Sequence, residues 1–133
     1  MLPLFVNDAG ELLAHRAGYA LLRCRPGITT TPVLAELLTR MGRLLVRNRW
    51  QYLLSDCREL PELPVACRRW IMDNWVESGI ERPALLHVAV LPPTNPAARR
   101  VAHGLLAHPS SGICHYPFAD EAAAHAFIVA RRA

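Results

Sequence analysis

The stretch WQYLLSDCRELPELPVACRRWIMDNW, residues 50–75, decides the fold that this sequence predicts. The near-continuous apolar run at 52–55 is typical of a short central strand in a parallel sheet. Pro61 and Pro64 confine residues 58–63 to a loop. The segment from about 65 to 78, which Gly79 ends, has helical spacing and carries two of the three tryptophans. Residues 50–75 therefore predict a buried strand, a loop and a tryptophan-bearing helix.

The residues before this unit predict a strand meander followed by a helix. Apolar segments at 2–6, 12–15 and 19–25 are separated by turn residues, with no room for a helix between them. We expect them to pair antiparallel. A threonine at 29–31 is the expected cap of a helix that begins at Pro32 and ends at 48–49.

The residues after the unit continue an alternation of strands and helices. Strands are predicted at 84–91 and 112–116, and helices are predicted to follow the caps Asn95 and Asp120. Such alternation implies right-handed crossovers and parallel pairing. The sequence therefore predicts a single α/β domain over residues 1–133, with a mixed sheet of four or five strands flanked by four helices.

The composition favours a soluble, cytoplasmic protein. Of the 133 residues, 52% are hydrophobic, but no apolar run approaches the ~20 residues of a membrane span. The N-terminus also lacks the layout of a signal peptide. The net charge is +4, and all 15 basic residues are arginine. This charge permits an anionic partner, but Trp50 beside Arg47 and Arg49 is the nearest approach to a nucleic-acid-binding pattern, and we do not expect nucleic acid as a partner.

Several segments together resemble a known family. They are LLSDCR at 53–58, Trp70 and Ile71, Asn74 and Trp75, VAVL at 88–91, and the tail from Tyr116 to Phe118 that leads into Asp120, Phe127 and Ile128. In layout and spaced hydrophobic residues the chain resembles the small STAS-like domains (sulphate transporter and anti-sigma-factor antagonist), most closely a bacterial branch. The resemblance implies a STAS-like fold and a non-enzymatic docking or switching role.

The sequence departs from the phosphorylation switch of that family. In the anti-sigma antagonists, a Ser or Thr follows a central strand at a helix N-terminus and is phosphorylated. No hydroxyl occurs here from Asp56 to Pro64, and Ser55 is expected to lie within the strand. We therefore expect the usual phosphoacceptor to be missing.

Asp56 and Arg58 are the polar candidates for an interaction or ligand site. They follow a central strand, at the edge where open α/β sheets bind ligands. Alternatively, Asp56 orders its own loop by accepting hydrogen bonds from nearby N–H groups, with Arg58 as its ion partner. Sequence alone leaves both interpretations open.

The tryptophans are the aromatic candidates. Trp70 and Trp75 are five residues apart, which places them ~140° apart around an α-helix. We therefore expect one to cover the sheet and the other to lie at the surface, as part of a homodimer or partner patch. The alternative is that it packs under the loop from Pro61 to Pro64. Trp50 is a third candidate.

No catalytic, metal or cofactor site is predicted. The six histidines form no pair with metal-ligand spacing, and His87 is expected to be a core residue. Cys24, Cys57, Cys67 and Cys114 form no C-x-x-C pair and are expected to be small buried hydrophobes. The glycines form no phosphate-binding loop.

Three functions are compatible with these patterns. The first is a non-catalytic protein-interaction or regulatory module without a cofactor. The alternative is a small-ligand or lipid-binding domain, with a pocket between the sheet and the helix that carries Trp70, Met72 and Trp75. The third is an enzyme that uses Asp56 or a cysteine.

Overall fold

Six strands form one mixed sheet in the computed structural model of this protein, which describes residues 3–27, 29–77, 79–106 and 111–132. The strands are β1 (Pro3–Asn7), β2 (Gly10–His15), β3 (Tyr19–Cys24), β4 (Tyr52–Asp56), β5 (Leu86–Leu91) and β6 (Ile113–Pro117). The helices are α1 (Thr31–Asn48), α2 (Val65–Trp70), the π-helix η1 (Ile71–Val76), α3 (Pro96–Leu106) and α4 (Glu121–Arg132). The α/β class is as predicted, but the sheet has six strands instead of four or five.

The additional strand results from the N-terminal meander, which joins the sheet completely. The strands lie in the order β1-β2-β3-β4-β5-β6, antiparallel from β1 to β3 and parallel from β3 to β6. The Asn7 side chain accepts a hydrogen bond of 2.9 Å from the Ala9 amide and so closes the turn between β1 and β2. A complete hairpin therefore extends the sheet beyond β3.

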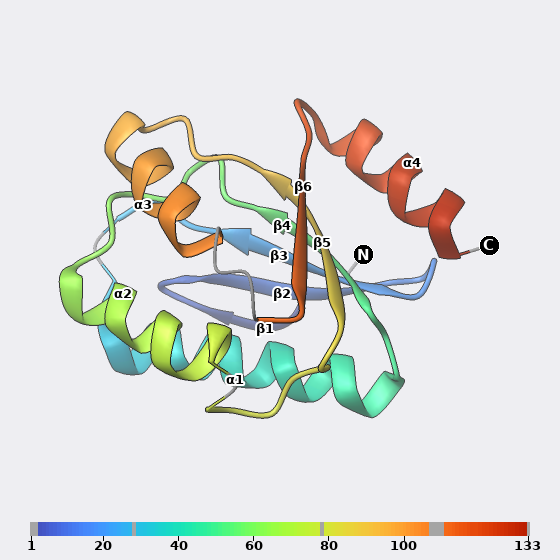
Figure 1. The fold of residues 1–133 in the computed structure, drawn as a ribbon, viewed down its shortest axis with the longest axis horizontal. Coiled ribbons are helices and arrows are strands. Elements are labelled where there is room, and N and C mark those ends of the chain that lie inside the picture. The colour runs from blue at the N-terminus through green and yellow to red at the C-terminus, as the bar shows by residue number, and fades with distance from the viewer. Residues whose placement is uncertain (1–2, 28, 78, 107–110, 133) are drawn as a thin grey trace.

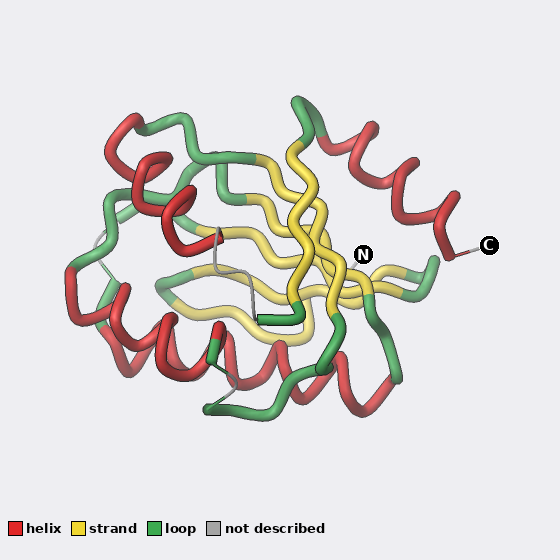
Figure 2. Tube along the Cα trace, viewed as in Figure 1, coloured by secondary structure: helices red, strands yellow, loops and turns green. Residues whose placement is uncertain are grey.

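The strand order explains the positions of the helices. Each connection from β3 to β6 advances by one strand in the same direction, and right-handed crossovers then put every connecting helix on one face of the sheet. Figure 1 shows α1, α2 and α3 on that face, while α4, which follows the last strand, lies against the other face. The tube in Figure 2 shows the strands as one layer between these two groups of helices.

Two of the three predicted helix caps are present as hydrogen bonds. Asn95 accepts bonds from the Ala97 and Ala98 amides, at 2.9 and 3.0 Å, and Asp120 accepts one from the Ala123 amide at 2.8 Å. At α1, Thr30 occupies the cap position, but its side chain makes no capping bond. The proline in the first turn lacks an N–H, so fewer donors there require a cap.

The predicted helix at 65–78 is divided between α2 and η1. The Glu77 amide donates to the Met72 carbonyl at 2.9 Å, five residues back, as in a π-helix. This wider turn brings residues five apart closer to one side than an α-helix does. Trp75 is therefore buried, and Trp70 is half-buried against the same core cluster. Trp75 is thus more deeply buried than Trp70, and the expected partner patch at the surface stays a prediction.

The segment after η1 passes very close to α1. A side-chain Cβ atom at Gly42 would lie 2.0 Å from the Glu81 carbonyl oxygen, so only glycine fits there without displacement of the backbone. Arg82 fixes the same segment. Its guanidinium donates to the carbonyl oxygens of Trp75 at 2.5 Å, Val76 at 3.0 Å and Ser111 at 2.6 Å. These contacts hold the end of η1 against the start of β6.

Within the described residues, the helices are too short or too polar to cross a bilayer.

Candidate functional site

A cavity of about 500 Å³ lies on the face of the sheet that α1, α2, η1 and α3 cover, between the strands and these helices. Alternate strand residues point to this side, which we call the cavity face. They include Leu22 of β3, Leu53 of β4, and Val88 and Val90 of β5. The remaining walls come from α1, η1, α3, β6 and the loops that follow β4 and β5.

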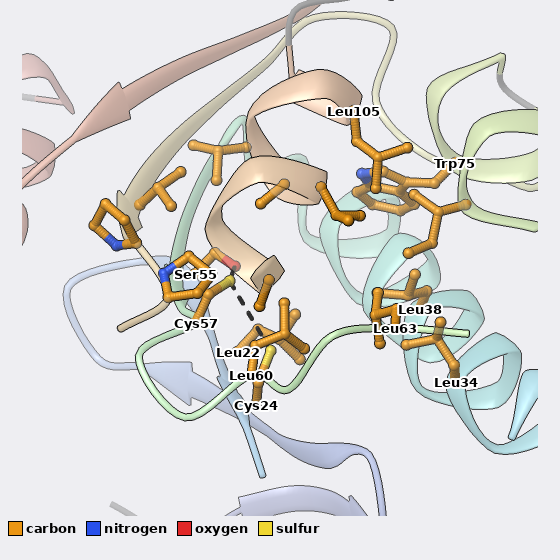
Figure 3. A pocket seen from close by; sticks show the side chains of 18 of the residues that line it. Leu22, Cys24, Leu34, Leu38, Ser55, Cys57, Leu60, Leu63, Trp75 and Leu105 are labelled. Carbon is orange, nitrogen blue, oxygen red and sulfur yellow. Dashed lines mark hydrogen bonds between the residues drawn. The ribbon is translucent and has the colours of Figure 1, made fainter. Parts of the chain in front are cut away.

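Small side chains on α3 leave this space open. Ala98 and Ala102 line the cavity where α3 faces the sheet, and neither reaches far from its helix. Figure 3 shows Trp75 of η1 and Leu105 of α3 beside each other at one end of the cavity. A π-helix is rare and is frequent at functional sites, and here it brings Trp75 into the cavity wall.

The other end of the cavity carries polar groups. Cys24, at the end of β3, and Cys57, just after β4, lie with their Sγ atoms 4.0 Å apart (Figure 3). The Ser55 Oγ is 3.2 Å from the Cys57 Sγ. The hydrogen bond from Cys24 lowers the pKa of the Cys57 thiol, and burial opposes this effect. The same hydrogen bond, together with burial, raises the pKa of Cys24.

Two histidines also line the cavity, His103 on α3 and His115 on β6. Burial lowers the pKa of His115 to about 4, so the ring is neutral at pH 7. Its Nδ1 atom is buried and accepts or donates no hydrogen bond within the described part of the chain. The cavity is therefore largely apolar. Ser55, the two thiols and this imidazole are among its few polar groups.

Of the three tryptophan candidates, one lines the cavity and two do not. Trp75 lines it. Trp70 and Trp50 are half-buried and pack against the core cluster of the cavity face, outside the lining. The pocket expected from the sequence was to be lined by Trp70, Met72, Trp75, Asp56 and Arg58. Of these five residues, Trp75 lines the cavity and the other four do not.

Asp56 and Arg58 lie away from the cavity, because adjacent residues of a strand point to opposite faces. The Asp56 side chain is on the face that α4 covers, which we call the α4 face. Arg58 donates to it from Nε and Nη2, both at 2.9 Å, and from its amide at 3.2 Å. Arg23 donates at 3.1 Å. The carboxylate thus orders its own loop, with Arg58 as its ion partner. This is the second of the two interpretations that the sequence left open.

The electrostatics of Asp56 agree with this role. Burial of the carboxyl by itself raises its pKa, but the hydrogen bonds from Arg58 and the charges of Arg58 and Arg23 outweigh burial. The net pKa is lower than usual, and the group is ionised at pH 7. Arg23 also pairs with Glu121 of α4 at 2.8 Å, so the cluster joins the sheet to α4.

Sequence reasoning missed the thiol pair. Only Cys67 is fully buried, as expected, whereas Cys114 is exposed, and Cys24 and Cys57 are half-buried. Cys24 and Cys57 are 33 residues apart, so only the parallel pairing of β3 with β4 brings them together. One signal for the pair was available in the sequence, because a cysteine lies at or just after the end of each of two predicted strands.

His87 is half-buried instead of being a fully buried core residue. It is satisfied, because its Nδ1 is 3.1 Å from the Tyr116 hydroxyl and its ring stacks on Tyr52. Among the described residues, no group of three or more His, Cys, Asp or Glu side chains is placed to hold a metal ion.

No protein-family model matches this sequence, and no curated protein matches it. The STAS-like resemblance therefore stays a prediction, and the functional argument rests on the cavity itself.

Proposed function

We propose that this protein is a non-catalytic binding domain whose ligand is a small, mainly apolar molecule held in the cavity. The cavity of about 500 Å³ is the observation that carries this proposal. Ligand sites typically have volumes of ~300–1,000 Å³, with apolar walls and a few polar groups that orient the ligand. The cavity has these properties: aliphatic side chains and Trp75 form most of the wall, and Ser55 and the two thiols form its polar end.

The size of the cavity argues for an occupant. Protein interiors are close-packed, and voids larger than a few water molecules are uncommon because the lining atoms lose their dispersion contacts. A cavity of this volume is therefore costly when it is empty. An apolar ligand restores the contacts, and its binding offsets the cost.

The surroundings of Asp56 support a non-catalytic role. A general base needs a free lone pair directed at substrate, but both oxygens of Asp56 accept hydrogen bonds from arginines. The carboxylate also lies on the α4 face, on the other side of the sheet from the cavity. Binding is thus the simplest function that the cavity serves.

Ligand titration with a fluorescence readout tests the proposal. We would titrate the protein with fatty acids and alkanols from eight to sixteen carbons, and follow tryptophan emission, since Trp75 lines the cavity. Val90→Phe places a ring in the cavity and should weaken binding by roughly tenfold, about 1.4 kcal/mol. Val129→Phe makes the same change at an exposed position of α4 and should leave the affinity unchanged.

Two results would contradict the proposal. One is the absence of saturable binding throughout the series, together with native mass spectra of the protein from its host that show no bound small molecule. The other is equal affinity in Val90→Phe and wild type, which would place the binding elsewhere. Trp75→Phe should remove the emission change, and Trp50→Phe should retain it.

A protein-interaction module is the second candidate, and α2 favours it. Val65 is 60% exposed at the start of this helix, and Trp70 is half-buried. Such a surface suits a homodimer or a partner protein, the role that the STAS-like resemblance implies. Light scattering tests the homodimer: the wild type should be larger than a monomer, and Trp70→Ala should reduce its mass. A wild type that stays monomeric at high concentration would exclude it.

A further inference from the structure

The thiols of Cys24 and Cys57 form a close pair, and the proposed binding function does not explain why they are paired. Their Sγ atoms are 4.0 Å apart, and both side chains line the polar end of the cavity. Because both residues line the cavity, small molecules that enter it can reach them. The other two cysteines have different surroundings. Cys67 is buried, with its Sγ near the Thr29 carbonyl oxygen, and Cys114 is exposed.

The backbone places the two cysteines next to each other at the ends of neighbouring strands. Arg23 and Asp56 are register partners in the parallel pair of β3 and β4, so the next position in the same register joins Cys24 with Cys57. Neighbouring strands lie ~4.8 Å apart, within the Cα–Cα range of disulfides. The sulfurs need to approach by about 2 Å to reach bonding distance.

We propose that Cys24 and Cys57 are a redox modification site, at which a low-molecular-weight disulfide converts the two thiols into a reversible disulfide. Cys57 is the attacking group. Its thiolate attacks one sulfur of the small disulfide RSSR, the S–S bond of the reagent breaks, and RS⁻ leaves with the electron pair. The product is a mixed disulfide between Cys57 and RS.

Cys24 completes the exchange. It loses its proton to solvent and attacks the Cys57 Sγ, so that the Cys24–Cys57 bond forms and a second RS⁻ leaves. Both RS⁻ groups take up protons as RSH. In sum, two protein thiols are oxidised, one RSSR is reduced to two RSH, and an excess of RSH reverses the reaction.

The environment distinguishes the two cysteines. Cys57 receives hydrogen bonds from Cys24 and is within 3.2 Å of the Ser55 hydroxyl, and these contacts favour its thiolate. Cys24 is the donor of the pair, and its thiol is the less acidic one. The disulfide would connect the end of β3 to the loop after β4 and remove both S–H groups from the polar end of the cavity. This inference goes beyond the proposed binding function and does not depend on it.

Mass spectrometry with hydroxyethyl disulfide as the probe tests the proposal. Cys114→Ser serves as the background, because it removes the exposed thiol. This protein should lose the mass of two hydrogen atoms, and peptide mapping should join Cys24 to Cys57. Adding Cys24→Ser should leave one stable hydroxyethyl adduct on Cys57. Adding Cys57→Ser instead should prevent the disulfide and leave at most one hydroxyethyl adduct, on Cys24.

Several outcomes would overturn the assignment. They are two separate adducts in place of a bond, no reaction at either thiol under conditions that modify Cys114 in the wild type, or a disulfide that joins Cys24 or Cys57 to another cysteine. Cys67 is 1% exposed and reports on folding. It should remain unmodified in every variant until denaturant is added, so slow reaction is not confused with unfolding.

Discussion

The two faces of the sheet are built from the same strands but are filled differently. The cavity face is covered by α1, α2, η1 and α3, yet its mostly aliphatic side chains leave about 500 Å³ unfilled. The α4 face has a single helix, and rings fill the space. Tyr19 stacks on His15 with centroids 4.6 Å apart, and its hydroxyl is 2.6 Å from His125 Nδ1 on α4. More helices do not therefore give tighter packing.

Side-chain volume explains the difference. An aromatic ring on a strand reaches a helix that is some distance away and contacts it with its edge or face. Rings of β6 and α4 do this on the α4 face, where Tyr116 and Phe127 have centroids 4.7 Å apart. On the cavity face, valine and leucine on the strands meet alanine on α3, and their combined length does not fill the gap. Helices cover a face, but the residues between determine whether it holds a ligand.

Adjacent leucines of β4 provide the largest test of this comparison. Leu54 is 0% exposed on the α4 face, and Leu53 is 2% exposed on the cavity face. Leu54→Ala should cost about 4 kcal/mol of unfolding free energy and Leu53→Ala about 2 kcal/mol, because Leu53 lines the cavity and has fewer protein contacts to lose. Urea unfolding followed by circular dichroism measures both. Equal costs would show that the cavity face is as well packed as the other.

Histidine titration gives the next largest effect. The pKa of His115 is about 4 in the folded protein and 6.5 when unperturbed, so the folded state binds fewer protons between these values. The stability contributed by the neutral ring is complete above pH 6.5 and decreases as the pH falls toward 4. The expected decrease is about 2 kcal/mol, after allowance for partial exposure. Unfolding at several pH values measures it.

The control compares His115 with a histidine on the α4 face. His115→Gln should flatten the pH dependence between 6.5 and 4, whereas His87→Gln, at a ring that is half-exposed, should change it less. Burial lowers the pKa of His87 as well, with the same sign. An unchanged slope in His115→Gln would mean that its imidazole is solvated.

The carboxylate cluster on the α4 face gives a smaller effect. Asp56→Asn removes the charge that Arg58 and Arg23 share, and should cost roughly 1.5 kcal/mol at pH 7. The pKa of Asp56 is lowered in the fold, so its contribution is present above the unfolded pKa and is lost as the pH falls through the folded value. The difference between wild type and variant should therefore vanish in acid. Ligand affinity should stay unchanged, since Asp56 is outside the cavity.

The smallest effect is expected at the exposed end of the same cluster. Glu121 pairs with Arg23 at 2.8 Å, but its side chain is 39% exposed. Glu121→Gln should cost about 0.5 kcal/mol, and high salt should remove the difference, because exposed ion pairs are screened. Thermal unfolding at low and high salt measures this. A cost as large as that of Asp56→Asn would mean that α4 depends on this pair.

Local signals predicted much of the fold. Asn95 and Asp120 cap their helices because the side chain and the amides it satisfies lie within three residues of each other. The turn at Asn7 formed the first hairpin for the same reason. The division of 65–78 into α2 and η1 was not predictable from spacing, since the contacts at the end of η1 come from Arg82, outside the 65–78 segment.

By itself, the sequence determined the alternation of strands and helices, the antiparallel start and the apolar character of the core, because these follow from periodicity and from contacts between near neighbours. Only the tertiary structure decided the site. The cavity is the space left between side chains of segments far apart in the chain, and the Cys24–Cys57 pair depends on the register of β3 with β4. Residues 50–75 show this division. The sequence predicted the strand at 52–55, but only the structure shows that Leu53 and Ser55 face the cavity while Asp56 on the same strand faces α4.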